Sequence, residues 1–162
     1  MTFAETLATF ILLGFWAVIG ATACTEIAHG AELQRDQAAS LYAVAYGHVG
    51  HLPARAPVVR FEARQALCQR VLRRDDCPVR GATIDGVVYL DDGLDFERPL
   101  DSSILLHELV HYVQHDRAGP ATTCAEWLRR EQQAYSIQIQ ALARIGADTL
   151  APVMAVRSLT CL

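Results

Sequence analysis

The chain has 162 residues, enough for one modest domain with its own core. Its 14 basic and 18 acidic side chains give a net charge of −4 at pH 7, and the basic residues form no stripe. A chain with this charge balance is not expected to bind nucleic acid.

The first segment in chain order is an apolar stretch from Leu7 to Ala23. It predicts that residues 1–23 are either a signal peptide, with an Ala-Thr-Ala cleavage pattern at its end, or an N-terminal membrane anchor. Glu5 stands where a basic residue usually precedes such a core, and a buried core helix is the alternative. The first two interpretations predict an exported protein that is periplasmic, attached to the cell envelope, or secreted.

Residues 24–32 are expected to form a linker, and residues 33–162 one domain. Helical periodicity extends from Leu33 to about His48, and residues 58–61 and 62–73 predict a short strand and an amphipathic helix. Two strands, Val79–Ile84 and Val87–Leu90, flank Asp85-Gly86, a strong hairpin signal. Two further helices, described below, complete the order, which predicts a small α+β domain.

Five cysteines are present, and their number is consistent with export. Cys24 directly follows the Ala-Thr-Ala pattern and resembles the cysteine of a degenerate lipobox. If Cys24 is removed or modified, an even number remains, and we expect the bridges Cys68–Cys77 and Cys124–Cys161. Spacing alone leaves three connectivities open, and a cysteine zinc site is disfavoured because no C-x-x-C occurs.

The motif HExxH occurs at residues 107–111, inside a run that predicts one buried helix from Ser103 to Val113. Histidines four residues apart lie ~40° apart around a helix and one turn from each other, so both imidazoles can reach one ion. Glu108 lies between His107 and His111, and is expected to hold and deprotonate a metal-bound water. The alternative is a helix with two incidental histidines, but unpaired polar side chains on a buried helix are costly. The motif therefore predicts a zinc site.

The third zinc ligand is expected on a second helix, which starts at Thr122 or Thr123 after Gly119-Pro120 breaks the chain. Glu126 fits the N3 position of a capping box, and its one-turn neighbours are arginines, so it belongs to a polar face. Glu131 instead has Trp127, Leu128, Ala134 and Tyr135 three and four positions away. A carboxylate on an apolar stripe is costly unless it is paired or binds a metal, so Glu131 is the predicted ligand.

Other histidines are weaker candidates. The metzincin pattern HExxHxxGxxH fails, because Gln114 and Arg117 stand where its glycine and third histidine would be. His115 lies on roughly the same side of the helix as His111, but the helix dipole explains a histidine near a carboxyl end. His48 and His51 are expected to be solvated loop residues.

With His107, His111 and Glu131, the chain resembles the gluzincin metallopeptidases, in which a glutamate on a following helix completes a His, His, Glu site. Glu131 comes 20 residues after His111, close to the separation in thermolysin-like enzymes, and residues 131–134 are similar to a Glu-x-x-Ala signature of some integral-membrane gluzincins. Residues 87–142 are also similar to a family of small exported bacterial HExxH proteins of unassigned function. Thermolysin-like enzymes carry an aspartate four residues after the ligand glutamate, where this chain has Tyr135.

The resemblance implies a zincin-like domain with a short sheet, an HExxH helix and a following helix that carries the third ligand. It also implies that Val87–Leu90 borders the cleft and pairs with an extended peptide substrate. The expected activity is zinc-dependent cleavage of peptide or other amide bonds, with Glu108 as the base and Tyr112 or Tyr135 near the oxyanion. Two alternatives remain at this point: an exported metal-binding envelope module without turnover, and a membrane-anchored interaction protein without a metal.

Overall fold

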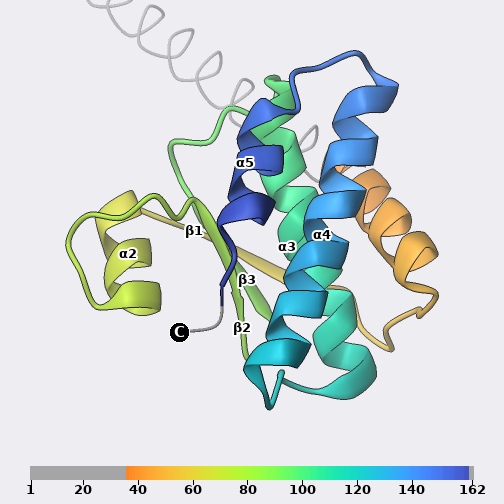
Figure 1. The fold of residues 1–162 in the computed structure, drawn as a ribbon, viewed down its shortest axis with the longest axis horizontal. Coiled ribbons are helices and arrows are strands. Elements are labelled where there is room, and N and C mark those ends of the chain that lie inside the picture. Colours follow the sequence, from red (N-terminus) through yellow and green to blue (C-terminus); the bar gives the residue numbers. More distant parts are fainter. Residues whose placement is uncertain (1–35, 161–162) are drawn as a thin grey trace, which may run out of the picture. The chain divides into compact units, whose positions relative to one another are not determined.

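A computed structural model describes residues 36–160 (Figure 1). Within that range the chain has five helices and one three-stranded sheet, which confirms the predicted α+β class. The described residues from Ala38 onward form one compact unit. The predicted signal peptide or anchor and the predicted linker lie outside the described residues. No helix in the described range combines the length and the apolarity needed to cross a membrane.

The elements follow the predicted order, with one addition. A helix over residues 36–49 is followed by β1 (Val58–Glu62), α2 (Arg64–Leu72), β2 (Gly81–Ile84), β3 (Val87–Asp91), α3 (Pro99–Ala118), α4 (Cys124–Arg144) and α5 (Leu150–Ser158). The helix predicted from Glu62 begins two residues later, because Glu62 pairs with Asp91 in the sheet. The addition is α5, which the sequence analysis missed.

The strand order is β1-β3-β2, with β3 parallel to β1 and antiparallel to β2. The predicted hairpin is confirmed: Asp85 and Gly86 form its turn with φ of 50° and 74°, the paired positive values of a type I′ turn. The role expected for Val87–Leu90 is wrong, because β3 is the central strand and both of its edges are already hydrogen-bonded. The edge strand beside α3 is β2.

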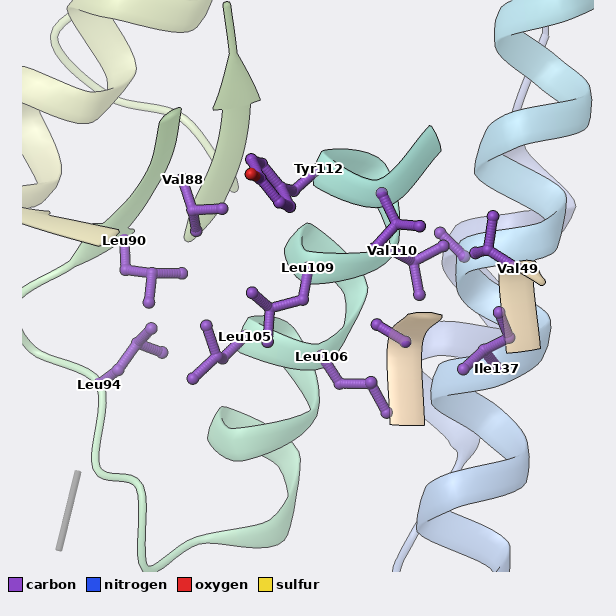
Figure 2. Packing of buried hydrophobic residues seen from close by; sticks show 13 residues of the cluster. Val49, Val88, Leu90, Leu94, Leu105, Leu106, Leu109, Val110, Tyr112 and Ile137 are labelled. Atoms are coloured by element: carbon purple, nitrogen blue, oxygen red, sulfur yellow. The ribbon is translucent and has the colours of Figure 1, made fainter. Parts of the chain in front are cut away.

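The core lies on both sides of α3, which explains why the HExxH run is apolar nearly all round (Figure 2). On one side Leu105 and Leu109 meet Val88 and Leu90 of β3, and on the other side α3 packs against α4. Burial of this kind stabilises the folded state by about 25 cal/mol per Å² of apolar surface removed from water. The HExxH motif is therefore built into the most deeply buried helix of the described chain.

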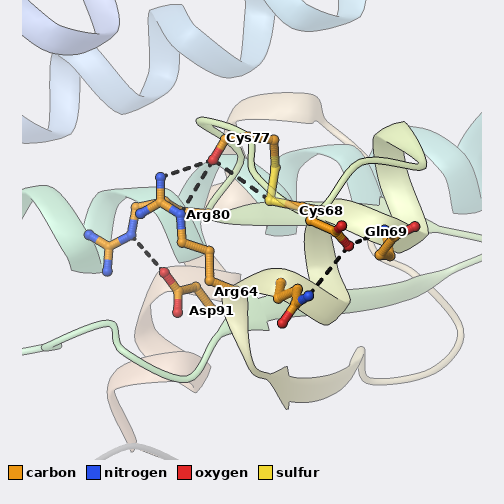
Figure 3. Close-up of a disulfide and its surroundings, with 8 residues drawn as sticks. Arg64, Cys68, Gln69, Cys77, Arg80 and Asp91 are labelled. Atoms are coloured by element: carbon orange, nitrogen blue, oxygen red, sulfur yellow. Dashed lines mark hydrogen bonds and ion pairs between the residues drawn. A yellow bond between two sulfur atoms is a disulfide. The ribbon is translucent and has the colours of Figure 1, made fainter.

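A disulfide joins Cys68 of α2 to Cys77, as predicted (Figure 3). Cys68 is fully buried, and Arg64 donates two hydrogen bonds to the Cys77 carbonyl oxygen, so the bridge closes the segment between α2 and β2. Cys124 is also disulfide-bonded. Cys161, its predicted partner, lies outside the described residues.

Candidate metal centre

His107, His111 and Glu131 meet where α3 and α4 lie side by side. The Nε2 atoms of His107 and His111 are 3.0 Å apart. The Glu131 carboxylate places Oε2 3.4 Å from His107 Nε2 and Oε1 3.2 Å from His111 Nε2. Among the described residues these three side chains form a group that could hold a metal ion, as the sequence predicted.

The spacing of the three donors fits a small tetrahedral ion. Ligand atoms at 2.0–2.1 Å from a tetrahedral zinc lie ~3.3 Å from one another. The three distances in the structure, 3.0, 3.2 and 3.4 Å, surround that value. Two imidazoles and one carboxylate are also a common donor set for hydrolytic zinc, which leaves a fourth position open.

Gln114 fixes the orientation of the His111 ring. Its Nε2 donates to the Arg130 carbonyl oxygen (3.2 Å) and to Gln133 Oε1 (2.9 Å). A backbone carbonyl only accepts, so the amide oxygen of Gln114 must be the atom that faces His111 Nδ1 at 2.9 Å. His111 therefore carries a proton on Nδ1, and in its neutral form the lone pair of Nε2 points towards Glu131.

A lone pair that faces a carboxylate at close range favours a cation between them. Burial lowers the pKa of His111, but the Glu131 hydrogen bond and the charges of Glu108 and Glu131 raise this pKa overall, so they favour the protonated ring in the metal-free protein. Burial likewise opposes ionisation of Glu131, but hydrogen bonds from His107 and His111 lower its pKa to about 2. The group is thus arranged for a positive charge at its centre, which a metal ion would supply.

His107 is held by packing. Its ring lies 4.3 Å from the Tyr135 ring, centroid to centroid, and its Nδ1 is buried without a hydrogen-bond partner among the described residues. Tyr135 occupies the position at which thermolysin-like enzymes carry an aspartate. The two histidines are therefore positioned differently, His111 by a hydrogen bond and His107 by an aromatic contact.

Glu108 is buried beside the group and is held by β2. The single proton of the Thr83 hydroxyl faces two Glu108 oxygens, the main-chain carbonyl oxygen at 2.9 Å and the carboxylate Oε2 at 3.0 Å. Gly81 leaves room for the Glu108 side chain, because a Cβ at that position would lie 2.8 Å from Glu108 Cγ. Arg80, which directly precedes β2, forms ion pairs with Asp91 and Asp101, and each N–O distance is 3.0 Å (Figure 3 shows the Asp91 contact).

The remaining candidates lie elsewhere. The Glu126 carboxylate accepts from the Thr122 N–H just before α4 and pairs with Arg130, as expected from its polar face. His51 pairs with Asp116, and neither His48 nor His115 belongs to the three-residue group. The Tyr112 hydroxyl donates to the Arg55 carbonyl oxygen at 2.8 Å, so it is committed to a structural hydrogen bond.

Sequence reasoning missed the residues that support the site. Gln114 lies three positions after His111, within the one-turn neighbourhood of a helix, so its role could have been predicted from spacing. Thr83 and Gly81 carry no such signal, because their contacts with Glu108 depend on how the hairpin packs on α3.

Comparisons with protein-family models, with curated proteins and with solved structures find no match for this chain.

Proposed function

We propose that this protein is a zinc-dependent hydrolase that cleaves peptide or related amide bonds, with a gluzincin-type centre in a zincin-like domain. The observation that carries the proposal is the set of His107, His111 and Glu131, whose buried donor atoms face one another at 3.0–3.4 Å. Under this proposal His107, His111 and Glu131 hold the metal. When bound, zinc would act as a Lewis acid and lower the pKa of water.

Glu108 is the base in this proposal. A metal-binding group alone has no need of a fourth ionisable side chain, yet Glu108 is kept buried and oriented by the Thr83 hydroxyl. Its charge acts on both His111 and Tyr135, which places it within electrostatic range of the centre. From there it can accept a proton from water and pass it to the leaving amine.

A peptide substrate is supported by the edge strand. β2 has only one neighbouring strand in the described sheet, and its residues Gly81 and Thr83 contact Glu108. An extended peptide that adds to a sheet edge gains main-chain hydrogen bonds. A peptide paired with β2 would have its backbone close to the proposed base.

We further propose that the protein is exported, and that the apolar segment over residues 1–23 is its signal peptide or membrane anchor. The Cys68–Cys77 disulfide supports this proposal, because such bridges persist in oxidising compartments.

Replacement of Glu108 by glutamine tests the proposed function. Glutamine keeps the size and can still accept from Thr83, but it lacks the basic carboxylate. Zinc content and thermal stability should stay unchanged, while hydrolysis of a peptide library should fall by at least ~10²-fold. The matched control is Glu97→Gln on the exposed surface, which should leave all three measurements unchanged.

An exported metal-binding module without turnover is the second candidate. It is favoured by one observation: His107 Nδ1 has no hydrogen-bond partner within residues 36–160, whereas thermolysin-like enzymes provide an aspartate that orients a zinc histidine. This candidate becomes the better account if wild type binds zinc stoichiometrically and neither it nor Glu108→Gln cleaves any peptide or peptidoglycan fragment.

A further inference from the structure

A hollow of about 520 Å³ opens where residues 36–49 end, at the carboxyl end of α3 and the first turns of α4. We call it the arginine hollow; six of its lining residues are Gln114, Arg117, Glu126, Arg129, Arg130 and Gln133. None of the three proposed metal ligands lines it. It is therefore separate from the metal centre, although Gln114 contributes to both.

The charge of the hollow is opposite to that of the chain. Three guanidinium groups and one carboxylate line the hollow, whereas the whole chain has a net charge of −4. Glu126 pairs with Arg130, which leaves the charges of Arg117 and Arg129 without a neighbouring acid in the lining. Arg129 is exposed and makes no ion pair within residues 36–160. Such a concentration of unneutralised charge favours a bound anion.

Two of the arginines are held in place by the backbone. Arg117 donates to the Val49 carbonyl oxygen at 3.0 Å, and Arg130 donates to the Gly119 carbonyl oxygen at 2.6 Å. A guanidinium has five N–H donors in a fixed plane, so each retains donors for a further acceptor. Carbonyl contacts that fix the plane reduce the entropy lost when an oxyanion binds.

We infer that the arginine hollow binds an oxyanion, either a carboxylate or a phosphate group, through Arg117, Arg129 and Arg130. Planar or tetrahedral oxyanions match the forked donors of arginine. The amides of Gln114 and Gln133 form the wall between this site and His111, so an occupant would contact the residues that orient a proposed metal ligand. The anion site itself does not depend on the proposed function.

The test uses the metal-free full chain at low ionic strength, since phosphate would precipitate zinc. Sodium phosphate and sodium acetate are titrated separately, and the side-chain N–H signals of the arginines and glutamines are followed by NMR. At least one of the two anions should bind saturably and shift the signals of Arg129, Gln114 and Gln133. Arg129→Gln should weaken binding by about tenfold, the loss expected for a charge-assisted hydrogen bond.

Arg144→Gln is the matched control, because it removes the same charge from an exposed position on the same helix, outside the hollow. A peptide with a free carboxyl terminus and its amidated form distinguish the source of the anion. Binding of only the free form assigns a peptide carboxylate, and binding of small anions alone assigns a free anion. The inference is overturned if neither anion nor the free peptide binds saturably, or if Arg129→Gln and Arg144→Gln weaken binding equally.

Discussion

The contact between β2 and Glu108 makes a sharp prediction at Gly81. In a Gly81→Ala protein the new Cβ would lie 2.8 Å from Glu108 Cγ, 3.0 Å from Glu108 Oε1 and 3.1 Å from Ile104 Cγ2. Carbon atoms in ordinary contact are ~3.5–4.0 Å apart. Glu108 or β2 must therefore move by roughly 0.7 Å or more, the difference between these separations.

The neighbours of Gly81 cannot move without loss. Glu108 is buried and its carboxylate accepts from Thr83, while Arg80 ties the same strand to Asp91 and Asp101. Overpacking of a filled site typically costs ~1–3 kcal/mol. For a domain of this size that corresponds to a fall in Tm of roughly 3–15 °C. Displacement of the proposed base by about 1 Å should lower any hydrolysis ~10²-fold.

Thermal and chemical unfolding of Gly81→Ala and Gly47→Ala, measured side by side, check this reasoning. Gly47 lies in the helix over residues 36–49, and a Cβ there meets nothing within 4 Å, so the same substitution should stabilise the protein by ~0.5–1 kcal/mol. Zinc binding should survive in both variants, because neither glycine contacts a proposed ligand. A Gly81→Ala protein as stable as wild type would refute the packing of β2 on Glu108.

Three further predictions concern the centre and the disulfide. Gln114→Leu should lower zinc affinity ~10–100-fold, because His111 loses the partner that fixes its tautomer; an unchanged affinity in a competition titration would contradict this role. The pKa of Glu131 is lower in the folded protein than its unfolded value of 4.5, so ionised Glu131 stabilises the metal-free fold at pH values above 4.5. This contribution is lost as the pH falls from 4.5 towards 2. The free energy of unfolding in urea should depend less on pH across that range for Glu131→Gln than for wild type. Equal slopes of this free energy against pH would argue against the ion pair. Removal of the Cys68–Cys77 bridge by a double serine substitution should lower the free energy of unfolding by about 2–3 kcal/mol, as expected for a closed loop with a separation of 9 residues. An unchanged denaturation midpoint would contradict a stabilising role for this bridge.

The sequence predicted the elements whose signals are local. Asp85-Gly86 requires positive φ at both positions, so the hairpin turn followed from residue type alone. The capping pattern at Thr123 and the break at Gly119-Pro120 likewise placed the start of α4. The group of His107, His111 and Glu131 followed from helix geometry and from the cost of a carboxylate on an apolar stripe.

The predictions failed for two different reasons. The strand order is decided by tertiary packing, because a hairpin sequence does not specify which of its strands will pair with β1. Val87–Leu90 was therefore expected at the substrate edge, whereas β2 is the edge strand. Helix α5 was missed although Asp148 accepts from the Leu150 N–H and Pro152 lies in the first turn, which are helix-start signals.

Zinc content of the purified protein tests the central claim most directly. We expect about one zinc per chain in wild type prepared without chelator, and a large loss in Glu131→Ala, which lacks one of the proposed ligands. Glu126→Ala is the matched control on the same helix: it should lose the stability that its carboxylate gives by accepting from the Thr122 N–H, but keep its zinc. Wild type without zinc, or Glu131→Ala with full zinc content, would contradict the assignment of this centre.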